Sequence, residues 1–394
     1  MTAQGAARAA DGAVVTGLGV YGPFGDAEAS WRAWAEARSA VGVHELAGVH
    51  GFGALAAARA APAPVEPWLR DRKLVKYMSP AARMAVVAAG GALRQAGLLE
   101  DERRRSELGL MMATGLIAFD LGQVDRAIRG SRDGDGQLDL VRLGREGLRA
   151  CHPLLPFQLL GNMPLGLVSI AYGIRGENFV LYPDAGQAGS CLEAAVRAIR
   201  VGRLAQVLVG ATAELVSLLP LATLGRRGQL AASPEAAQPF GSSHAGIAPA
   251  DAAAFVVLER ESSARARGAA ILSRLDAVAP VAVLAPDDAA GEPELRRCVW
   301  AEICGELAPV RLVVTGTCSA AEDQGVLDDA SALWGLEPGA IVSLDGVLGY
   351  PGPAALLLAL GFGCSAPAGR TLVWSAPFAE HGCALLLAPG GGPP

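Results

Sequence analysis

Short apolar runs recur along the chain and alternate with longer stretches whose apolar positions are three and four residues apart. The short runs predict buried strands, and the stretches between them predict helices. One helix is predicted over 79–98, with Ser79 as its N-cap and Pro80 in its first turn. The predicted strands span 13–19, 108–115, 178–183, 205–215, 252–259, 311–317, 341–346, 371–377 and 383–389.

This alternation is typical of parallel or mixed sheets covered by helices. The second half of the chain repeats the order of elements found in the first, which indicates two copies of one plan, although no internal sequence identity is visible. The polar stretch 225–246 marks the junction. We therefore divide the chain into an N-terminal half, 1–246, and a C-terminal half, 247–394.

Composition and charge narrow the class of protein. No apolar run approaches the roughly 18 to 20 residues of a membrane span, and the N-terminus lacks a basic segment followed by a long apolar one, so we expect a cytoplasmic protein. The net charge of −6 argues against nucleic acid or an anionic membrane as the main partner. The 7 cysteines show no metal-ligand spacing, so we expect reduced core thiols, no metal and no cofactor.

The stretch "TGLGVYG" carries Gly17, Gly19 and Gly22 in the spacing of a dinucleotide-binding loop. Pro23 and Gly25 interrupt the helix that such a loop requires, and no strand with an acidic end follows about 20 residues later. The pattern therefore favours a glycine-rich turn for tight backbone packing.

The segment 178–202 begins as a short apolar strand and continues, after a turn of small residues, as an amphipathic helix. The unpaired amides and positive dipole end of such a helix favour a thiolate or alkoxide at the turn. Here the turn offers Asp184, Ala185, Gly186 and Gln187, so it lacks a thiol or hydroxyl nucleophile.

Three landmarks follow one another along the chain: "VVTGLGVYGPFGDAEASWRAWAEARSAVG", "DRKLVKYMSPAARMAVVAAGGALRQAGL" and "PFGSSHAGIAPADAAAFVVLE". In this order they resemble the β-ketoacyl synthases of the thiolase superfamily over nearly the whole chain. The resemblance implies an α/β thiolase fold with a duplicated αβαβα five-layer architecture, in which each half defined above is thiolase-like.

The resemblance also locates the family's catalytic positions. Counting back from Gly202, the cysteine nucleophile falls on Ala185. The HGTGTxxND motif appears as "TGTCSAAED", with Thr315 at the first histidine; the KSxxGH motif appears as "DGVLGY", with Asp345 at the lysine and Tyr350 at the second histidine. Condensation needs a thiolate to hold the acyl chain and neutral imidazoles to stabilise the enolate and oxyanion. We therefore expect no condensing activity and no catalytic residue of that kind.

Such a chain is similar to a chain length factor, or KSβ, of type II polyketide synthases. These subunits pair with an active ketosynthase (KSα) and shape the tunnel for a polyketide or polyene chain carried by acyl carrier protein, so the implied partners are that ketosynthase, in a heterodimer, and the carrier protein. Gln187, Ala188 and Gly189 match three letters of the subfamily's "QAGG" segment, although a gapless count places Gln187 two residues late.

Three alternatives stay open. An amide at Gln187 could polarise a thioester carbonyl and let the chain decarboxylate malonyl groups on carrier protein to start a chain. Cys191 could serve an independent acyltransferase, but its neighbours Leu192, Ala195 and Ile199 suggest a core face and hence a structural thiol. The third alternative is a homodimeric binding protein for acyl thioesters.

The resemblance implies a chain-length gate in "IAFDLGQVDRAI", whose Phe-Asp pair matches the subfamily's GGFDFTHREF segment. A bulky side chain shortens a tunnel and a small one extends it. The alternative is an ordinary helix packed on the core. The gate positions are Phe119, Gly122 and Arg126.

Two surfaces are implied for partners. Ketosynthases carry basic residues that meet the acidic carrier protein, at the positions held here by Arg70, Arg72, Lys73 and Lys76; a solvated helix start is the alternative. Family members also associate through the strand before the nucleophile turn, which pairs with its mate across a two-fold axis. That strand is Asn178, Phe179, Val180, Leu181, Tyr182 and Pro183.

Overall fold

Strands and helices alternate along the computed structural model, which describes residues 12–45, 54–116, 121–183, 186–282, 292–365, 369–378 and 381–390. The strands are β1 (Ala13–Tyr21), β2 (Gly42–Glu45), β3 (Ala54–Ala57), β4 (Gly109–Thr114), β5 (Asn178–Leu181), β6 (Gln206–Glu214), β7 (Asp251–Arg260), β8 (Ser273–Ala282), β9 (Arg311–Thr315), β10 (Ile341–Ser343), β11 (Thr371–Phe378) and β12 (His381–Pro389). The α-helices are α2 (Ala27–Ala35), α3 (Pro80–Gln95), α4 (Glu102–Glu107), α5 (Leu121–Arg129), α6 (Leu140–Arg145), α7 (Leu155–Gln158), α8 (Met163–Tyr172), α9 (Gln187–Arg200), α10 (Leu218–Arg226), α11 (Glu261–Ala266), α12 (Glu292–Cys304), α13 (Ala320–Trp334), α14 (Asp345–Leu348) and α15 (Pro353–Cys364). Short 3₁₀ turns are η1 (Glu66–Trp68), η2 (Arg72–Tyr77), η3 (Gly147–Ala150) and η4 (Pro338–Ala340).

Each apolar run that predicted a strand forms one, and the predicted helix over 79–98 is α3. The Ser79 side chain caps α3 by accepting the N–H of Ala82 at 3.2 Å, and Pro80 is the first helical residue. Strand β8 and the β2–β3 hairpin were not predicted. In β8, Asp276 and Pro280 interrupt the apolar pattern, and partners on both sides hold the strand nevertheless.

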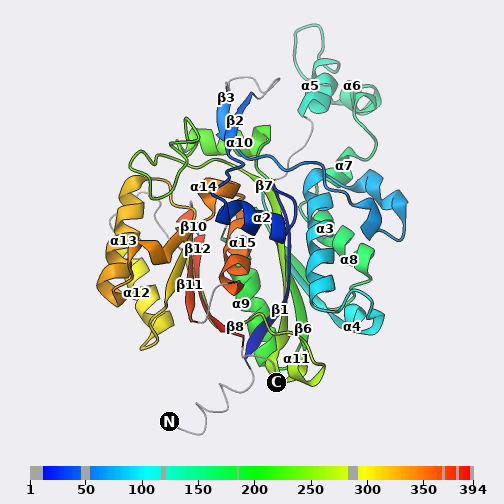
Figure 1. Cartoon of the computed structure of the whole chain (residues 1–394). Helices are drawn as coiled ribbons and strands as arrows, with labels where there is room; N and C mark the ends of the chain where they lie inside the picture. The colour runs from blue at the N-terminus through cyan, green and yellow to red at the C-terminus, as the bar shows by residue number, and fades with distance from the viewer. Residues whose placement is uncertain are drawn as a thin grey trace.

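Apart from the β2–β3 pair, the strands are arranged in two five-stranded halves with helices between and outside them (Figure 1). The ten-stranded order is β10-β9-β11-β12-β8-β1-β7-β6-β4-β5, and β1 pairs with β8 over only three residue pairs, Ala13–Val15 with Ser273–Leu275, among the described residues. Helices α9 and α15 pack between the halves, α3 and α8 cover the outside of one, and α12 and α13 lie outside the other. The expected αβαβα layering is confirmed.

Both halves follow one topology. From the central junction outward, the strands run β1-β7-β6-β4-β5 in one half and β8-β12-β11-β9-β10 in the other. When the five strands of each half are numbered in chain order, both halves have the spatial order 1-5-4-2-3. A central helix, α9 or α15, precedes the fourth strand in each case. Because β7 pairs with both β1 and β6, it closes the first repeat. On this topology we propose a repeat boundary in the α11 segment between β7 and β8, while the division at 246/247 stays a prediction from the sequence.

The glycines of the opening stretch serve close packing of β1 on α3. A Cβ built on Gly19 would overlap the carbonyl oxygen of Ala88, and one on Gly17 would overlap that of Ala92. Gly91 of α3 completes the approach, because its own Cβ would lie 3.4 Å from the Cα of Gly19. The backbone of β1 thus touches α3 directly, which favours the packing interpretation of the glycine pattern.

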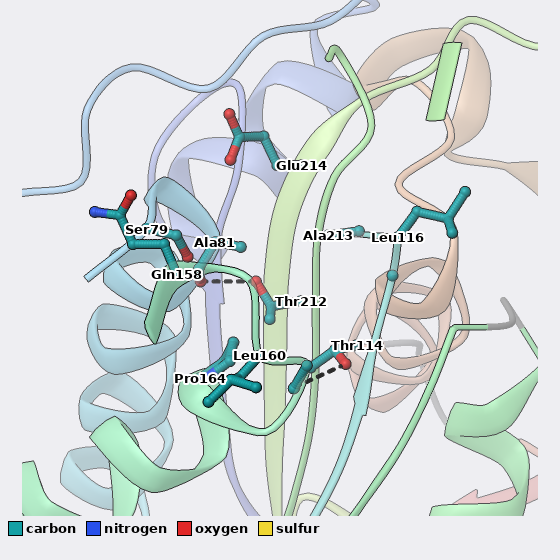
Figure 2. A pocket seen from close by; sticks show the side chains of 12 residues that line it. Ser79, Ala81, Thr114, Leu116, Gln158, Leu160, Pro164, Thr212, Ala213 and Glu214 are labelled. Atoms are coloured by element: carbon teal, nitrogen blue, oxygen red, sulfur yellow. Dashed lines mark hydrogen bonds between the residues drawn. The ribbon is translucent and has the colours of Figure 1, made fainter. Parts of the chain in front are cut away.

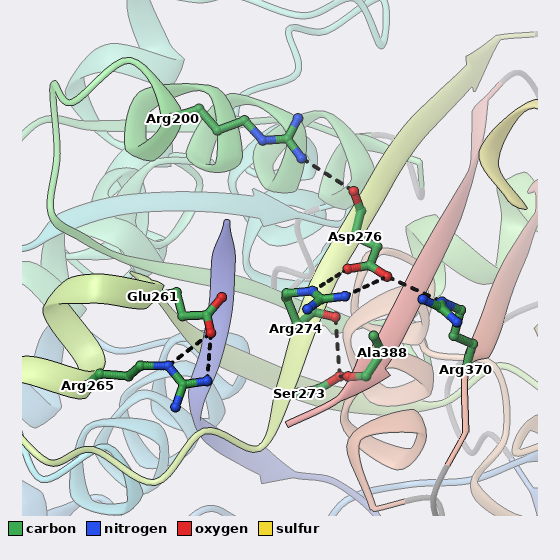
Figure 3. Close-up of polar contacts among 8 residues, drawn as sticks. All are labelled: Arg200, Glu261, Arg265, Ser273, Arg274, Asp276, Arg370 and Ala388. Carbon is green, nitrogen blue, oxygen red and sulfur yellow. Dashed lines mark hydrogen bonds and ion pairs between the residues drawn. The ribbon is translucent and has the colours of Figure 1, made fainter. Parts of the chain in front are cut away.

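Polar contacts join β8 to elements of both halves (Figure 3). The Asp276 carboxylate accepts a hydrogen bond from Arg274 Nε at 2.5 Å and lies 3.5 Å from Arg370 Nε, while its backbone carbonyl accepts from Arg200 of α9 at 3.4 Å. Ser273 donates to the carbonyl of Ala388 in β12 at 2.7 Å. These contacts fix the end of α9 opposite to the nucleophile turn.

We predict that Gly19→Ala lowers the free energy of unfolding by about 1–3 kcal/mol, because the added methyl group must displace the α3 backbone. Urea denaturation of the purified chain measures the change. The matched control is Gly22→Ala, whose Cβ would make an ordinary 3.5 Å contact with Ala252 Cβ. Equal stability of the two variants would contradict the packing argument.

Candidate functional site

The turn before α9 is closed from the second half of the molecule. Gly186 is the N-cap of α9, and a Cβ on it would overlap the backbone of His381 in β12. The half-buried Gln187 is the first helical residue. The predicted nucleophile position, Ala185, lies outside the described residues. The turn is therefore held tightly at Gly186, with the Gln187 amide at the positive end of the helix.

Cys191 lies one turn further along α9 and is fully buried in the core cluster between the two half-sheets. Burial raises the pKa of its thiol to about 12. The thiol is protonated at neutral pH and carries little nucleophilic character. The structure thus favours the structural interpretation of Cys191 over an acyltransferase role.

Thr315 and Asp345, at two of the degenerate catalytic positions, are directly bonded. β9 and β10 are parallel neighbours, so their carboxyl ends meet at one edge of the sheet, where β9 ends on Thr315 and α14 begins on Asp345. The Thr315 hydroxyl is 2.8 and 3.0 Å from the two Asp345 carboxylate oxygens, and the Gly316 N–H donates to Asp345 Oδ2 at 2.7 Å. Burial nevertheless raises the pKa of Asp345 to about 6.

Tyr350, at the second histidine position, is also buried, with 1% of its surface exposed. Its ring lies against Gly316, whose Cβ would be 3.3 Å from Tyr350 Cε2, and its backbone bonds with Ala248 and Ala250. The structure therefore brings three of the four degenerate positions together around Gly316.

A buried His–Asp pair accompanies this cluster, and the sequence did not reveal it. His244 Nδ1 lies 2.6 Å from Asp323 Oδ2, and both side chains are almost fully buried. Burial alone would lower the pKa of His244, but its hydrogen bond to Asp323 and the negative charges of Asp323 and Asp345 outweigh burial and raise the pKa. The two residues are 79 positions apart in the sequence. The one local feature that could have drawn notice is a lone histidine in a Gly/Ser-rich stretch.

Glu322 adds a third carboxyl group. Its Oε2 accepts the Cys318 N–H at 2.7 Å, and burial is the main cause of its raised pKa. Asp345, Asp323 and Glu322 are balanced here by one imidazole. The cluster stabilises positive charge and binds protons, which is the opposite of the oxyanion stabilisation that condensation requires.

A small polar pocket lies between α3, β4, β6 and the segment 158–164 (Figure 2). Thr212 donates to the carbonyl of Ala81 at 2.9 Å, and Thr114 donates to that of Gly161 at 3.2 Å. Its volume of about 20 Å³ accommodates about one water molecule. This pocket cannot hold an acyl chain within the single subunit.

Glu214 lines that pocket, and Asp251 lies opposite it on the neighbouring strand. Burial, followed by the charge of Asp251, raises the pKa of Glu214 to about 7, and burial raises that of Asp251 to about 6. Asp251 accepts the Val216 N–H at 3.0 Å, whereas Glu214 Oε2 has no hydrogen-bond partner among the described residues. Sequence reasoning missed this pair because the two acids are 37 positions apart on separate strands.

The predicted gate is not enclosed by this chain. Gly122 and Arg126 lie on α5 and are both exposed, and Phe119 lies outside the described residues. In Figure 1, α5 and α6 extend away from the layered body.

Of the two predicted partner surfaces, the basic one is exposed, and the predicted dimer strand lies at a sheet edge with Phe179, Val180 and Leu181 half-buried. Arg70, Arg72, Lys73 and Lys76 lie on and before η2, and all four are exposed. β5 forms one edge of the large sheet and pairs with β4. The Leu110 N–H donates to the Glu177 carbonyl, so the backbone groups of Glu177 face β4. Successive residues of a strand direct their backbone N–H and C=O groups to opposite sides, so those of Asn178 and Val180 face the open edge.

Among the described residues, no helix combines the length and apolar character needed to cross a bilayer. Within the same part of the chain, no group of three or more His, Cys, Asp or Glu side chains is placed to hold a metal ion.

The family described as β-ketoacyl synthase, N-terminal domain, matches residues 11–264. The chain belongs to the β-ketoacyl synthase family. Nodulation protein E of Rhizobium meliloti is 29% identical over 292 residues, which cover 73% of this chain and 68% of that protein. The tetracenomycin polyketide synthase ketoacyl synthase beta subunit of Streptomyces glaucescens is 29% identical over 267 residues, covering 65% of this chain and 60% of that protein.

Solved structures confirm the thiolase fold of this β-ketoacyl synthase family member. The ishigamide ketosynthase/chain length factor superposes with a TM-score of 0.76 at 21% identity, over 97% of this chain and 100% of that one. The structure of a type II PKS acyl-carrier protein in complex with its ketosynthase bound to the hexaketide contains a chain that superposes with a TM-score of 0.73 at 17% identity. The superposition covers 96% of this chain and 99% of that one. Similarity at this level of identity shows the fold.

We predict that Asp345→Asn flattens the pH dependence of stability. The pKa of Asp345 in the folded chain is about 6, which lies above the ordinary aspartate value, so the folded state binds this proton more tightly than the unfolded state does. Protonation of Asp345 therefore adds to the free energy of unfolding at low pH, and this added stability is lost as the pH rises through about 6. The whole effect is about 3 kcal/mol and develops between about pH 4 and 7, of which about 1.4 kcal/mol falls between pH 5 and 8.

Urea denaturation at a series of pH values measures this slope. Asp328→Asn, at an exposed position on α13, is the control and should leave the slope unchanged. A slope in Asp345→Asn as steep as that of the unmodified chain would show that Asp345 is ionised throughout this range.

Proposed function

We propose that this β-ketoacyl synthase family member is a non-condensing subunit, a chain length factor, that pairs with an active ketosynthase. The observation that carries the proposal is the bonded group of Thr315, Asp345 and Gly316, with Tyr350 beside it. A buried acid occupies the lysine position and two hydroxyl groups occupy the histidine positions. Such a set supplies neither the nucleophile nor the imidazoles of condensation.

The relatives support this assignment. One of them is named as the beta subunit of a polyketide ketoacyl synthase, and one structural neighbour is named as a ketosynthase/chain length factor. Carried over to this chain, these names suggest a heterodimer that acts on a polyketide or polyene chain held by acyl carrier protein in the cytoplasm.

Two features of the surface fit a subunit that works in a complex. β5 leaves Asn178 and Val180 facing an open sheet edge, which a partner strand can continue. The gate residues Gly122 and Arg126 are exposed, so the partner must complete the tunnel. The tunnel would then form at the subunit interface, with this chain supplying one wall.

The rival function is decarboxylation of malonyl groups with Gln187 as the polarising amide. Its half-buried position at the start of α9 is the observation in its favour. An acyltransferase using Cys191 fits poorly, since burial raises the pKa of that thiol to about 12.

We expect the isolated chain to release no acetyl product from malonyl-loaded carrier protein, and to restore chain elongation when mixed with its ketosynthase. Mass spectrometry of the carrier protein measures both. Acetyl product from the isolated chain that disappears in Gln187→Ala would establish the decarboxylase instead. Elongation by the ketosynthase alone, unchanged by this chain, would contradict the proposed role.

Val180→Pro is expected to abolish assembly with the ketosynthase while the subunit stays folded. Proline removes an N–H that faces the open edge and leaves the β4 side of β5 intact. Size-exclusion chromatography of the mixture measures assembly, and circular dichroism checks the fold. A heterodimer of normal affinity would place the interface elsewhere.

Phe119→Ala, co-expressed with the ketosynthase, is expected to lengthen the product, because a smaller side chain extends the tunnel. Liquid chromatography with mass spectrometry of the products measures chain length. Arg126→Ala serves as a comparison at another of the predicted gate positions. An unchanged product from a well-folded complex would remove Phe119 from the gate.

A further inference from the structure

The loop 238–247, which lies between α10 and β7, is bonded along its length to the start of α13. The Gly246 N–H donates to the Cys318 carbonyl at 2.7 Å. In the opposite direction, the Ala320 N–H donates to the His244 carbonyl at 2.9 Å. These backbone bonds bring the His244 side chain over the first turn of α13, where it meets Asp323.

One carboxylate oxygen holds two parts of this loop. Phe240 has a φ of 63°, in the left-handed region that a residue with a side chain adopts only at a cost in free energy. Its N–H donates to Asp323 Oδ2 at 2.6 Å. The same oxygen lies 2.6 Å from His244 Nδ1. Asp323 therefore stabilises both the strained residue and the imidazole.

The contact between His244 and Asp323 is closed to solvent. The two side chains are 1% and 3% exposed, and Asp323 Oδ1 is buried with no hydrogen-bond partner among the described residues. A carboxylate in such surroundings needs a nearby positive charge, because a buried charge without compensation is costly. The imidazolium form of His244 supplies that charge.

Further acids face the imidazole from the neighbouring elements. Glu322 lies beside Asp323 in the first turn of α13, and Asp345 begins α14. Within the described chain, no Lys or Arg side chain bonds to any of these three acids, so His244 is the cation of the group. Two further titratable groups, Cys318 and Tyr350, lie on the adjoining segments.

We propose that His244 and Asp323 form a proton-dependent latch, which fastens the loop 238–247 to α13 when both ring nitrogens of His244 are protonated and loosens when one proton leaves to solvent. The neutral imidazole can still donate one hydrogen bond. The carboxylate then lacks its counter-charge, so the latch is weakened and the loop opens more often.

The direction of the pH dependence follows from the closed state. Burial lowers the pKa of His244, but the hydrogen bond to Asp323 and the negative charges of Asp323 and Asp345 outweigh burial and raise the pKa. The closed latch thus binds the proton more tightly than the open loop does. Its added stability is complete at low pH and is lost as the pH rises through the folded pKa of His244.

A pH titration of the purified full chain, followed in ¹H–¹⁵N spectra of the imidazole nitrogens, tests the proton site. The chain has 5 histidines, and His244→Gln identifies the signal of His244. We expect this signal to titrate at a higher pH in the folded chain than in the chain unfolded by urea. Asp323→Asn, which removes the negative charge, should move the folded midpoint to lower pH.

Hydrogen–deuterium exchange of the loop 238–247, corrected for the intrinsic effect of pH on exchange, tests the latch itself. We expect protection of the loop to fall severalfold between about pH 6 and 9, since each pH unit between the closed and open midpoints is worth a factor of ten in the opening equilibrium. His244→Gln should remove this pH dependence and leave the loop less protected at pH 6. The matched control, His152→Gln at an exposed position, should preserve the dependence.

A His244 signal that titrates as in the unfolded chain, or that Asp323→Asn leaves in place, would overturn the proposal. So would protection of the loop that does not change with pH. An equal loss of protection in β4 and α9 would mean global unfolding and would equally rule out a latch. Should His244→Gln fail to fold, the unmodified chain and Asp323→Asn still decide. These measurements involve no ketosynthase, so their outcome is independent of the proposed function.

Discussion

The molecule depends on packing two helices between two sheets. α9 and α15 contact both half-sheets, so the space between them admits only small or apolar side chains. The sequence of α15, "PAALLLALGFGC", has no charged residue, and its Gly361 lies against Leu18 of the opposite half. Gly189 of α9 is confined in the same way by Cys383. Because these contacts fix the helix, the turn at Gly186 is held in place.

The sequence anticipated the elements whose signals are local. The apolar runs located the strands of both halves except β8, and Ser79 with Pro80 marked the start of α3. β8 escaped because Asp276 and Pro280 lie within it, and only its pairing with β1 and β12 makes it a strand. The pairing of β7 with β1 likewise has no local signal in the sequence, because the two strands are far apart along the chain.

The candidate site shows the same limit. The motifs located Thr315, Asp345 and Tyr350, but not the hydrogen bonds between them. His244 and Asp323, like Glu214 and Asp251, are single residues in unremarkable stretches, and only the fold brings each pair together. Burial is the main cause of the raised pKa values of Glu214 and Asp251, and a composition or spacing pattern does not report burial.

The bonding of Asp345 opposes single substitutions that would introduce condensing chemistry at this site. A lysine restored at this position alone would bury an ammonium beside Thr315 and remove the acceptor for the Gly316 amide. A histidine restored at Thr315 alone would face a carboxylate that holds its pKa high. Each of these single substitutions gives a less stable site or one with an unsuitable charge, so introducing the catalytic groups requires several substitutions together.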